Sequence, residues 1–280
     1  MMLKTTIRDC LFLNWALPAE AVPEPPPPLR YQLHSWQGQD YVLASAVLFY
    51  QDAIRLRALP FVRLCYPQLD LRLAVLDDEG VPSVLYPKML TPAWVVPGAR
   101  LMTHQPVSKA RLDFPRPSRD VNGGPWHWRV ERDGILKVRA WPDSPAVGEG
   151  PRLGSWEQVV RYFLERPRGY VEDSGVLHRI EFRHPQVAVW PVKAEVAEDG
   201  LLARLLHLAS GAGWPGLHSA WLCPEIPFAF ELGIVPKIAT APAMPQPAAS
   251  RVAVYRRADV LKPPADSGEG VSNERRRAAC

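Results

Sequence analysis

The sequence has few cysteines and no long apolar segment, and both absences narrow the class of protein. Its four cysteines are scattered and form no CxxC or Cys/His cluster with the spacing of a metal site. We expect Cys10, Cys65, Cys223 and Cys280 to be reduced, mostly buried thiols of a cytoplasmic protein. No window approaches the ~18 consecutive apolar residues of a membrane span, and the N-terminus lacks the apolar core of a signal peptide. We therefore expect a cytoplasmic protein with no membrane partner.

The body of the chain has no net charge of either sign. Of 33 Lys and Arg and 29 Asp and Glu, eight basic and four acidic residues lie from Lys237 onward. Residues 1–236 therefore hold 25 residues of each sign. This balance gives no support to a phosphate-binding groove, so we expect no nucleic-acid partner.

The chain also lacks the short motifs of the common nucleotide, hydrolase and zinc-protease sites. No GxGxxG, GxxxxGKS/T, GxSxG or HExxH pattern occurs in the sequence. We therefore predict neither a cofactor nor a bound metal.

The clearest pattern that is present is a capped helix beginning at Ser155. Ser155 and Gln158 form a capping box. Apolar residues then recur at the spacing of one buried helical face, at Trp156, Val159, Val160, Phe163 and Leu164. Because Pro167 disfavours the α conformation in the residue before it, the helix should end near Arg166.

A turn and two strands are predicted after this helix. We expect the turn at Arg168-Gly169-Tyr170 and the strands over Leu177–His184 and Trp190–Glu195. Alternation along the first strand places one set of side chains on a face that should point inward: His178, Ile180, Phe182 and His184.

Residues 1–153 have the pattern of strands joined by tight turns. A first strand is expected over Ile7–Leu17. Turns that contain glycine are expected at Gln37–Gln39 and at Asp77–Gly80, each between two strand-like runs.

A further hairpin can be aligned residue by residue. A three-residue loop over Arg132–Gly134, with Gly134 in the left-handed conformation, would place apolar residues opposite one another. The expected pairs are Val130 with Leu136, Trp128 with Val138, and Trp126 with Ala140.

These elements predict an α+β protein that is mainly antiparallel β, with a large curved or barrel-like sheet and a few flanking helices. Short helices are expected over Trp94–Met102 and Leu201–Ala209, the second as a packing helix. We expect one domain over residues 1–236, because the composition and the charge balance both change near residue 237. Residues 237–280 should form a disordered, Pro/Ala-rich, basic tail, with one candidate strand at Val252–Tyr255.

Three segments together resemble a known family. They are Leu11-Phe12-Leu13-Asn14-Trp15 before a Pro-rich step, the strand Leu69–Val75, and Trp156–Glu195 with its Arg166-Pro-Arg-Gly-Tyr turn. Their order over residues 4–236 resembles that of the YqjF-like bacterial proteins, a domain of unknown function numbered 2071 and related in fold to acetoacetate decarboxylase. The resemblance implies a cone-shaped antiparallel β-barrel around an apolar pocket, and it implies no established reaction.

The resemblance also draws attention to Lys88. The related decarboxylase forms a Schiff base on a lysine in a Tyr-Pro-Lys-Lys context, and the second lysine lowers the pKa of the first. This chain has Tyr86-Pro87-Lys88-Met89, and Met89 cannot supply that cation. Burial could still depress the pKa of Lys88. Lys88 is thus a candidate nucleophile, with a solvated strand-end lysine and a non-covalent anion contact as alternatives.

Further candidates for ligand binding are Trp15, His104, Arg168, His178 and Trp190. The alternative for His178 is an ordinary hydrogen-bonded histidine of the core or rim. Arg168, like Arg166 on the same turn, could point its guanidinium at a ligand carboxylate, or form a structural ion pair with Glu172 or Asp173. The tryptophans could line a cavity or simply fill the core.

We therefore expect a cytoplasmic protein that binds a small apolar or carboxylated molecule in a β-barrel pocket. Two alternatives stay open: a Schiff-base lyase or decarboxylase that uses Lys88, and a non-catalytic interaction scaffold. A cavity with a buried lysine would favour chemistry, a cavity without a lysine would favour binding, and the lack of a cavity would favour the scaffold. The sequence leaves open whether the protein forms a homo-oligomer.

Overall fold

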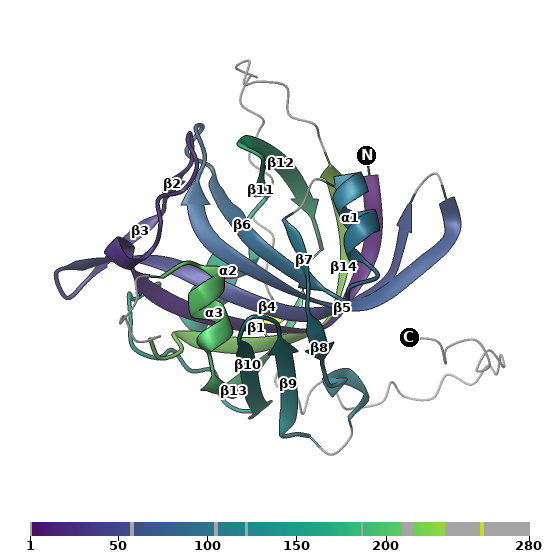
Figure 1. Cartoon of the computed structure of the whole chain (residues 1–280). Coiled ribbons are helices and arrows are strands. Elements are labelled where there is room, and N and C mark those ends of the chain that lie inside the picture. The colour runs from purple at the N-terminus through teal and green to yellow at the C-terminus, as the bar shows by residue number, and fades with distance from the viewer. Residues whose placement is uncertain are drawn as a thin grey trace.

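The computed structural model describes residues 2–56, 59–103, 106–120, 123–185, 187–208, 215–232 and 253–254. In these ranges the chain has fifteen strands and three α-helices (Figure 1). The strands are β1 (Met2–Pro18), β2 (Arg30–Tyr31), β3 (Leu33–Trp36), β4 (Gln39–Leu56), β5 (Leu59–Leu76), β6 (Pro82–Thr91), β7 (Val107–Lys109), β8 (Arg111–Asp113), β9 (Trp126–Glu131), β10 (Ile135–Pro142), β11 (Arg168–Asp173), β12 (Val176–Arg183), β13 (Ala188–Glu198), β14 (Ser219–Leu232) and β15 (Ala253–Val254). The helices are α1 (Val96–Thr103), α2 (Trp156–Leu164) and α3 (Gly200–Leu205).

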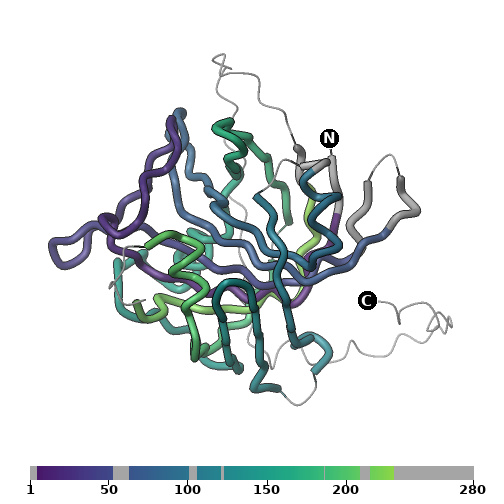
Figure 2. The backbone as a smooth tube through the Cα atoms, in the orientation of Figure 1, coloured from purple at the N-terminus to yellow at the C-terminus, as the bar shows by residue number. Residues whose placement is uncertain are grey.

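Seven of the strands form a closed ring. β1 pairs with β4 on one side and with β14 on the other. From β4 the pairing continues through β5, β6, β11 and β12, and β12 pairs with β14. Neighbours in the ring are antiparallel, apart from β6 and β11, which are parallel. The mainly antiparallel architecture with a few helices is thus confirmed, and the long strands β1, β4 and β5 curve across the whole body (Figure 2).

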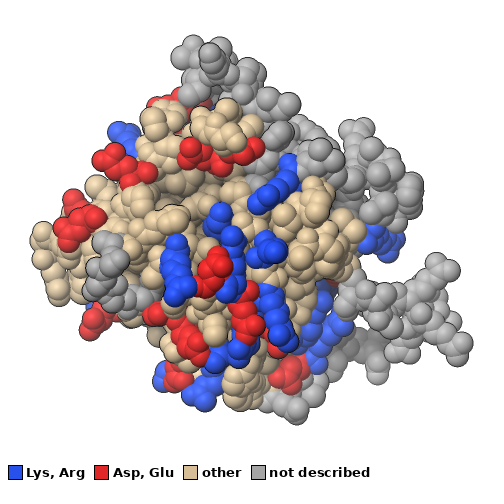
Figure 3. Space-filling model, in the orientation of Figure 1, with Lys and Arg blue, Asp and Glu red and all other residues tan. Residues whose placement is uncertain are grey.

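A second group of strands extends from the ring. β13 pairs with β14, and β10, β9 and β8 follow in order. Together with α3, this second sheet covers the outer face of the ring, where leucines of β1, β4 and β5 pack against tryptophans and valines of β9 and β10. On its solvent side, Lys and Arg alternate with Asp and Glu, so the face in Figure 3 carries both signs of charge.

The helix α2 packs against the opposite face of β1 and β14. Four of the five residues of the predicted apolar face are buried, namely Val159, Val160, Phe163 and Leu164. The fifth, Trp156, is half-buried. Both bonds of the capping box are present, since Ser155 Oγ accepts from the Gln158 amide and Gln158 Oε1 accepts from the Ser155 amide. No helix in the described ranges is long and apolar enough to cross a membrane.

Two of the predicted turns are confirmed, the one at Gln37 and Gly38 and the loop Arg132–Gly134. Gln37 and Gly38 both have positive φ, 51° and 81°, as a two-residue turn of the type I′ class requires. The hairpin between β9 and β10 has the predicted three-residue loop and the three predicted pairs. Gly134, however, does not adopt a positive φ. A Cβ atom there would lie 3.1 Å from the Leu201 amide nitrogen, so any other residue would require a small shift of α3 away from the loop.

Other expectations need correction. The segment Arg168–Asp173, in which a turn was expected, is the strand β11, and the turn lies at Ser174 and Gly175. The reason is tertiary, because β11 inserts between β6 and β12 and closes the ring. The strand β14 was not predicted at all, although it is 14 residues long.

The helix α1 lies within two residues of the expected bounds, whereas α3 begins one residue before the expected start and ends four residues early, at Leu205. Cys10 and Cys223 are free and buried, as expected, whereas Cys65 is disulfide-bonded, so the expectation of a reduced thiol is wrong there. In the tail, Ala253–Val254 pair with β13 inside the candidate strand, and the rest of residues 237–280 lies outside the described ranges. The boundary at residue 236 and the disorder of the tail therefore stay predictions.

Candidate functional site

A cavity lies inside the ring of strands. Its walls come from β1, β5, β6, β12 and β14 and from the end of α2, and because these strands are not all neighbours, the enclosed space must be interior to the ring. Its volume of about 30 Å³ has room for about two water-sized groups. The lining residues are Ile7, Cys10, Phe12, Arg72, Val84, Tyr86, Leu164, Arg166, Phe182, His184, Val187, Ile226 and Phe228.

Most of the wall is apolar because inward-facing aromatic residues of different strands meet there. The ring centroid of Phe182 lies 5.9 Å from that of Tyr86 and 5.5 Å from that of Phe228. Gly169 of β11 makes this contact possible, since a Cβ atom at that position would lie 2.5 Å from the Phe182 ring and 2.7 Å from the Tyr86 ring. The glycine of the Arg-Gly-Tyr sequence thus has a packing role in the wall of the cavity.

Arg166 brings a buried positive charge to this wall. It follows α2 and is 5% exposed. Its Nε donates to the Tyr162 carbonyl oxygen at 2.8 Å, and its Nη1 donates to Gln32 Oε1 at 2.6 Å. Its Nη2 is buried and has no hydrogen-bond partner in the described part of the chain. Burial lowers the pKa of Arg166, which reflects the cost of holding this charge away from water.

Arg72 of β5 brings a second positive charge. Its guanidinium lies over the rings of Phe12 and Tyr86, with 5.3 Å and 5.4 Å between the Arg72 Cζ and the ring centroids. The Nε of Arg72 is buried without a hydrogen-bond partner among the described residues. Neither cavity arginine therefore has all its donors satisfied, which is unusual for buried polar groups.

Asp70 precedes Arg72 on the same face of β5. The carboxyl group is 5% exposed, and Gln68 Nε2 donates to its Oδ1 at 2.6 Å. Burial raises the pKa of Asp70 to about 6, although the nearby Arg72 charge acts in the opposite direction. Burial also raises the pKa of the Cys10 thiol in the cavity wall, so this cysteine is not an activated nucleophile.

Lys88 does not line the cavity. It lies opposite Leu71, whose side chain belongs to the apolar cluster between the ring and the second sheet, and directly paired residues share a face. Lys88 is half-buried, and burial lowers its pKa, with further lowering from the Arg132 and Arg100 charges. A cavity without a lysine favours binding over imine chemistry and over a scaffold with no cavity.

Imine trapping at Lys88 should fail with simple β-keto acids. The ring interior, where a substrate could be held, is on the other side of β6, so nothing in the described structure orients a keto group toward Lys88 Nζ. Incubation with acetoacetate and borohydride, followed by peptide mass spectrometry, tests this. We expect Lys88 to be labelled no more than Lys109, which is exposed. A stoichiometric adduct on Lys88 alone would overturn the expectation.

The other candidate residues are not brought together. Trp15 and Trp190 are buried in the cluster between the ring and the second sheet. Trp190 also lines a separate cavity of about 260 Å³ with Trp126. His178 is half-buried and lies opposite Val171, and His104 is outside the described residues.

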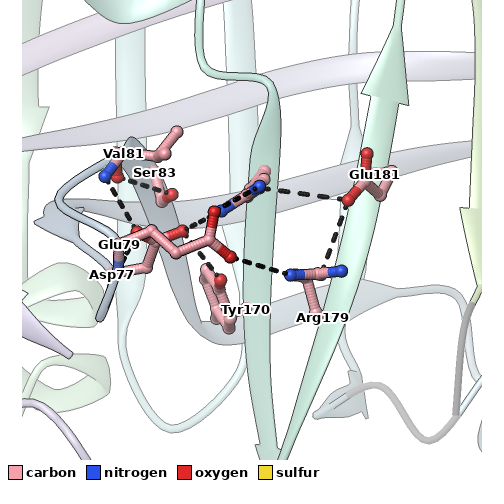
Figure 4. Close-up of polar contacts among 8 residues, drawn as sticks. Asp77, Glu79, Val81, Ser83, Tyr170, Arg179 and Glu181 are labelled. Atoms are coloured by element: carbon pink, nitrogen blue, oxygen red, sulfur yellow. Dashed lines mark hydrogen bonds and ion pairs between the residues drawn. The ribbon is translucent and has the colours of Figure 1, made fainter. Parts of the chain in front are cut away.

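Arg168 forms ion pairs with carboxylates of the protein itself, those of Asp77, Glu79 and Glu181, which are labelled in Figure 4. Its Nη1 lies 2.7 Å from Asp77 Oδ2, its Nη2 lies 3.0 Å from Glu79 Oε2, and its Nε lies 3.9 Å from Glu181. Tyr170 adds a hydrogen bond of 3.0 Å to Asp77 Oδ2. This is the structural ion pair that was the alternative for Arg168, with partners on the β5–β6 turn instead of Glu172 or Asp173.

The comparisons with known proteins agree with this architecture. A family model for the domain of unknown function 2071, described as an uncharacterized conserved protein, matches residues 4–220. The chain belongs to this family. No curated protein matches the chain in sequence.

The family member also has the fold of several solved structures. The enduracididine biosynthesis enzyme MppR, complexed with the condensation product of pyruvate and imidazole 4-carboxaldehyde, is similar with a TM-score of 0.54 at 12% identity, over 82% of this chain and 87% of that chain. The same enzyme complexed with pyruvate has a TM-score of 0.51 at 11% identity, over 82% and 87%. Acetoacetate decarboxylase from Legionella pneumophila has a TM-score of 0.53 at 10% identity, over 83% and 86%. The family member therefore shares the acetoacetate decarboxylase-like fold.

Sequence reasoning missed Arg72 and Asp70, whereas Arg166 was expected, together with Arg168, as a turn residue that could point its guanidinium at a carboxylate. A signal for the first two was present, because Asp70 and Arg72 alternate with leucines in the run Leu69–Val75. A charged face of a strand normally points to solvent. Closure of the ring turns this face inward.

Proposed function

We propose that this protein binds a small carboxylated molecule whose carboxylate group, about the size of the two water-sized groups that fit, occupies the cavity inside the ring. The observation that carries the proposal is the buried Nη2 of Arg166, which lacks a hydrogen-bond partner in the described ranges. A buried guanidinium with an unused donor is costly, and a carboxylate is its natural partner because it accepts charge-assisted hydrogen bonds.

The rest of the cavity fits the same class of ligand. Arg72 supplies a second cation with an unused donor, and the aromatic wall of Phe182 and Phe228 suits the apolar atoms that adjoin the carboxylate. One solved structure of this fold is a complex with pyruvate, a small carboxylate, so the ligand class has a precedent in the fold. We regard the ring as the cone-shaped barrel of the acetoacetate decarboxylase-like proteins, formed by the domain of residues 1–236.

Replacement of Arg72 by glutamine should weaken carboxylate binding by about tenfold to a hundredfold, the usual effect of losing a hydrogen bond to a charged group. Ligand-observed NMR with acetate, propionate, pyruvate and isovalerate provides the measurement. Arg161→Gln is the matched control, because Arg161 lies on the exposed side of α2, with a 46% exposed side chain. Equal affinities of Arg72→Gln and Arg161→Gln, or no binding of any of these acids to the unaltered protein, would refute the proposal.

A further inference from the structure

The charged side chains that line or adjoin the cavity include two arginines and one aspartate. Arg72 and Arg166 are in its wall, and Asp70 is next to Arg72 on the same strand face. His184 is also in the wall, but its Nδ1 faces the Pro185 carbonyl oxygen at 3.0 Å and its Nε2 faces the Leu164 carbonyl oxygen at 3.2 Å. Both ring nitrogens of His184 thus face backbone carbonyl oxygens, and a neutral imidazole can donate a hydrogen bond to only one of them. With Asp70 ionised, Arg72, Arg166 and Asp70 together carry one net positive charge, with His184 left out of the sum.

We propose that Asp70 makes the cavity selective for ligands with a single negative charge. The inference rests on the proposed function and adds the class of ligand and the residue that determines it. One bound carboxylate would neutralise the charge of Arg72, Arg166 and Asp70, whereas a second negative charge would be compensated only if Asp70 took up a proton, which costs free energy at a pH above its pKa.

The geometry keeps Asp70 close to Arg72 without using the donors of Arg72. Residues two positions apart on a strand are about 7 Å apart and point to the same side. Gln68 holds Asp70 Oδ1, and no ion pair joins Asp70 to Arg72 in the described structure. A carboxylate bound to Arg72 would be separated from the Asp70 carboxylate by a distance of this order. In a medium of low effective dielectric constant, the repulsion between two such charges changes a binding equilibrium by about tenfold or more.

Among the titratable groups that interact with Asp70, only Asp70 itself can change its charge near neutral pH. The titratable side chains coupled to it are Cys10 of β1, Tyr66 and Arg72 of β5, and Tyr86 of β6. Burial raises the pKa of the thiol and of both tyrosines, so these three groups are neutral near pH 7. Burial also raises the pKa of Asp70 to about 6, so this carboxyl group takes up a proton readily when a second anion approaches.

Propionate and malonate test the inference at pH 7.5, where they carry one and two negative charges. The unaltered protein should bind propionate at least about tenfold more tightly than malonate. In Asp70→Asn this preference should shrink several-fold or reverse, because the negative charge beside Arg72 is gone. Asp113→Asn, on the exposed side of β8, is the control and should keep the original preference.

A second measurement needs no variant. Calorimetric titrations in buffers of different ionisation enthalpy should show that the unaltered protein takes up a proton when malonate binds. Much less proton uptake should accompany the binding of propionate. Equal affinities for the two acids, an unchanged ratio in Asp70→Asn, or no difference in proton uptake would each overturn the selectivity while leaving the binding function intact. No binding of either acid would reject the binding function itself.

Discussion

Replacement of Asp77 by alanine should lower the free energy of unfolding by about 3 to 5 kcal/mol, the range for breaking a buried ion pair. The Asp77 side chain is fully buried and accepts four hydrogen bonds. Its Oδ1 holds the β5–β6 turn through the amides of Glu79 and Val81, and its Oδ2 accepts from Arg168 and Tyr170. The substitution would release the turn from β11 and leave the Arg168 guanidinium, with a 12% exposed side chain, without its main partner.

Urea unfolding gives the measurement, and Asp78→Ala in the same turn is the control. Asp78 is exposed, so its replacement should change stability by less than about 0.5 kcal/mol. Similar losses for Asp77→Ala and Asp78→Ala would contradict the role of the buried carboxylate.

The effect of Asp77 should also depend on pH. Burial alone raises the pKa of Asp77, but hydrogen bonds from Arg168, Val81 and Tyr170 outweigh it, and the pKa is lowered. A carboxyl group with a lowered pKa stabilises the fold above its ordinary pKa, and this contribution is lost as the pH falls through the pKa of the folded state. The difference in stability between the unaltered protein and Asp77→Ala should therefore narrow below about pH 4.

Replacement of Phe163 by alanine should cost about 3 to 5 kcal/mol, as large core truncations do. Phe163 packs its ring between the helix and the start of β14, with its ring centroid 5.6 Å from that of Trp221 and 6.2 Å from that of His218. Its removal would leave a void between the helix and β14.

Arg161→Ala on the same helix is the matched comparison. The Arg161 side chain is 46% exposed, and its ion pair with Glu165 has a length of 3.7 Å, so we expect a loss below about 0.5 kcal/mol. Equal losses in urea unfolding of Phe163→Ala and Arg161→Ala would show that the helix does not bury the face described above.

Local features of this protein could be predicted from the sequence because they depend on neighbours along the chain. The capping box at Ser155 needs only Gln158 three residues later. The hairpin of β9 and β10 has its predicted register because only one loop length brings apolar residues opposite one another. Gln37 and Gly38 adopt the positive φ values that such a turn demands.

The side of the sheet to which Lys88 points depends instead on an irregularity in the pairing of β5 with β6. Leu73 pairs with Leu85 and Leu71 pairs with Lys88, so two steps along β5 match three along β6. This bulge lies at Tyr86-Pro87, where proline cannot donate to a regular ladder. Without the extra residue, Lys88 would oppose Asp70 and point into the ring. A shift by one residue moves a side chain to the other face, and Lys88 therefore points away from the cavity.

The sequence by itself determined the strand propensities, the capped helix and the turns, since each arises from a few adjacent residues. Only the tertiary structure decided which strand faces became interior. β14 closes the ring by pairing with β1, and this closure, between residues about 200 positions apart, turns the charged side of β5 inward. Arg72 then lines the same cavity as Arg166, from a different part of the chain. Alternation along one strand shows that two faces differ, and it is the pairing of distant strands that determines which of them encloses a site.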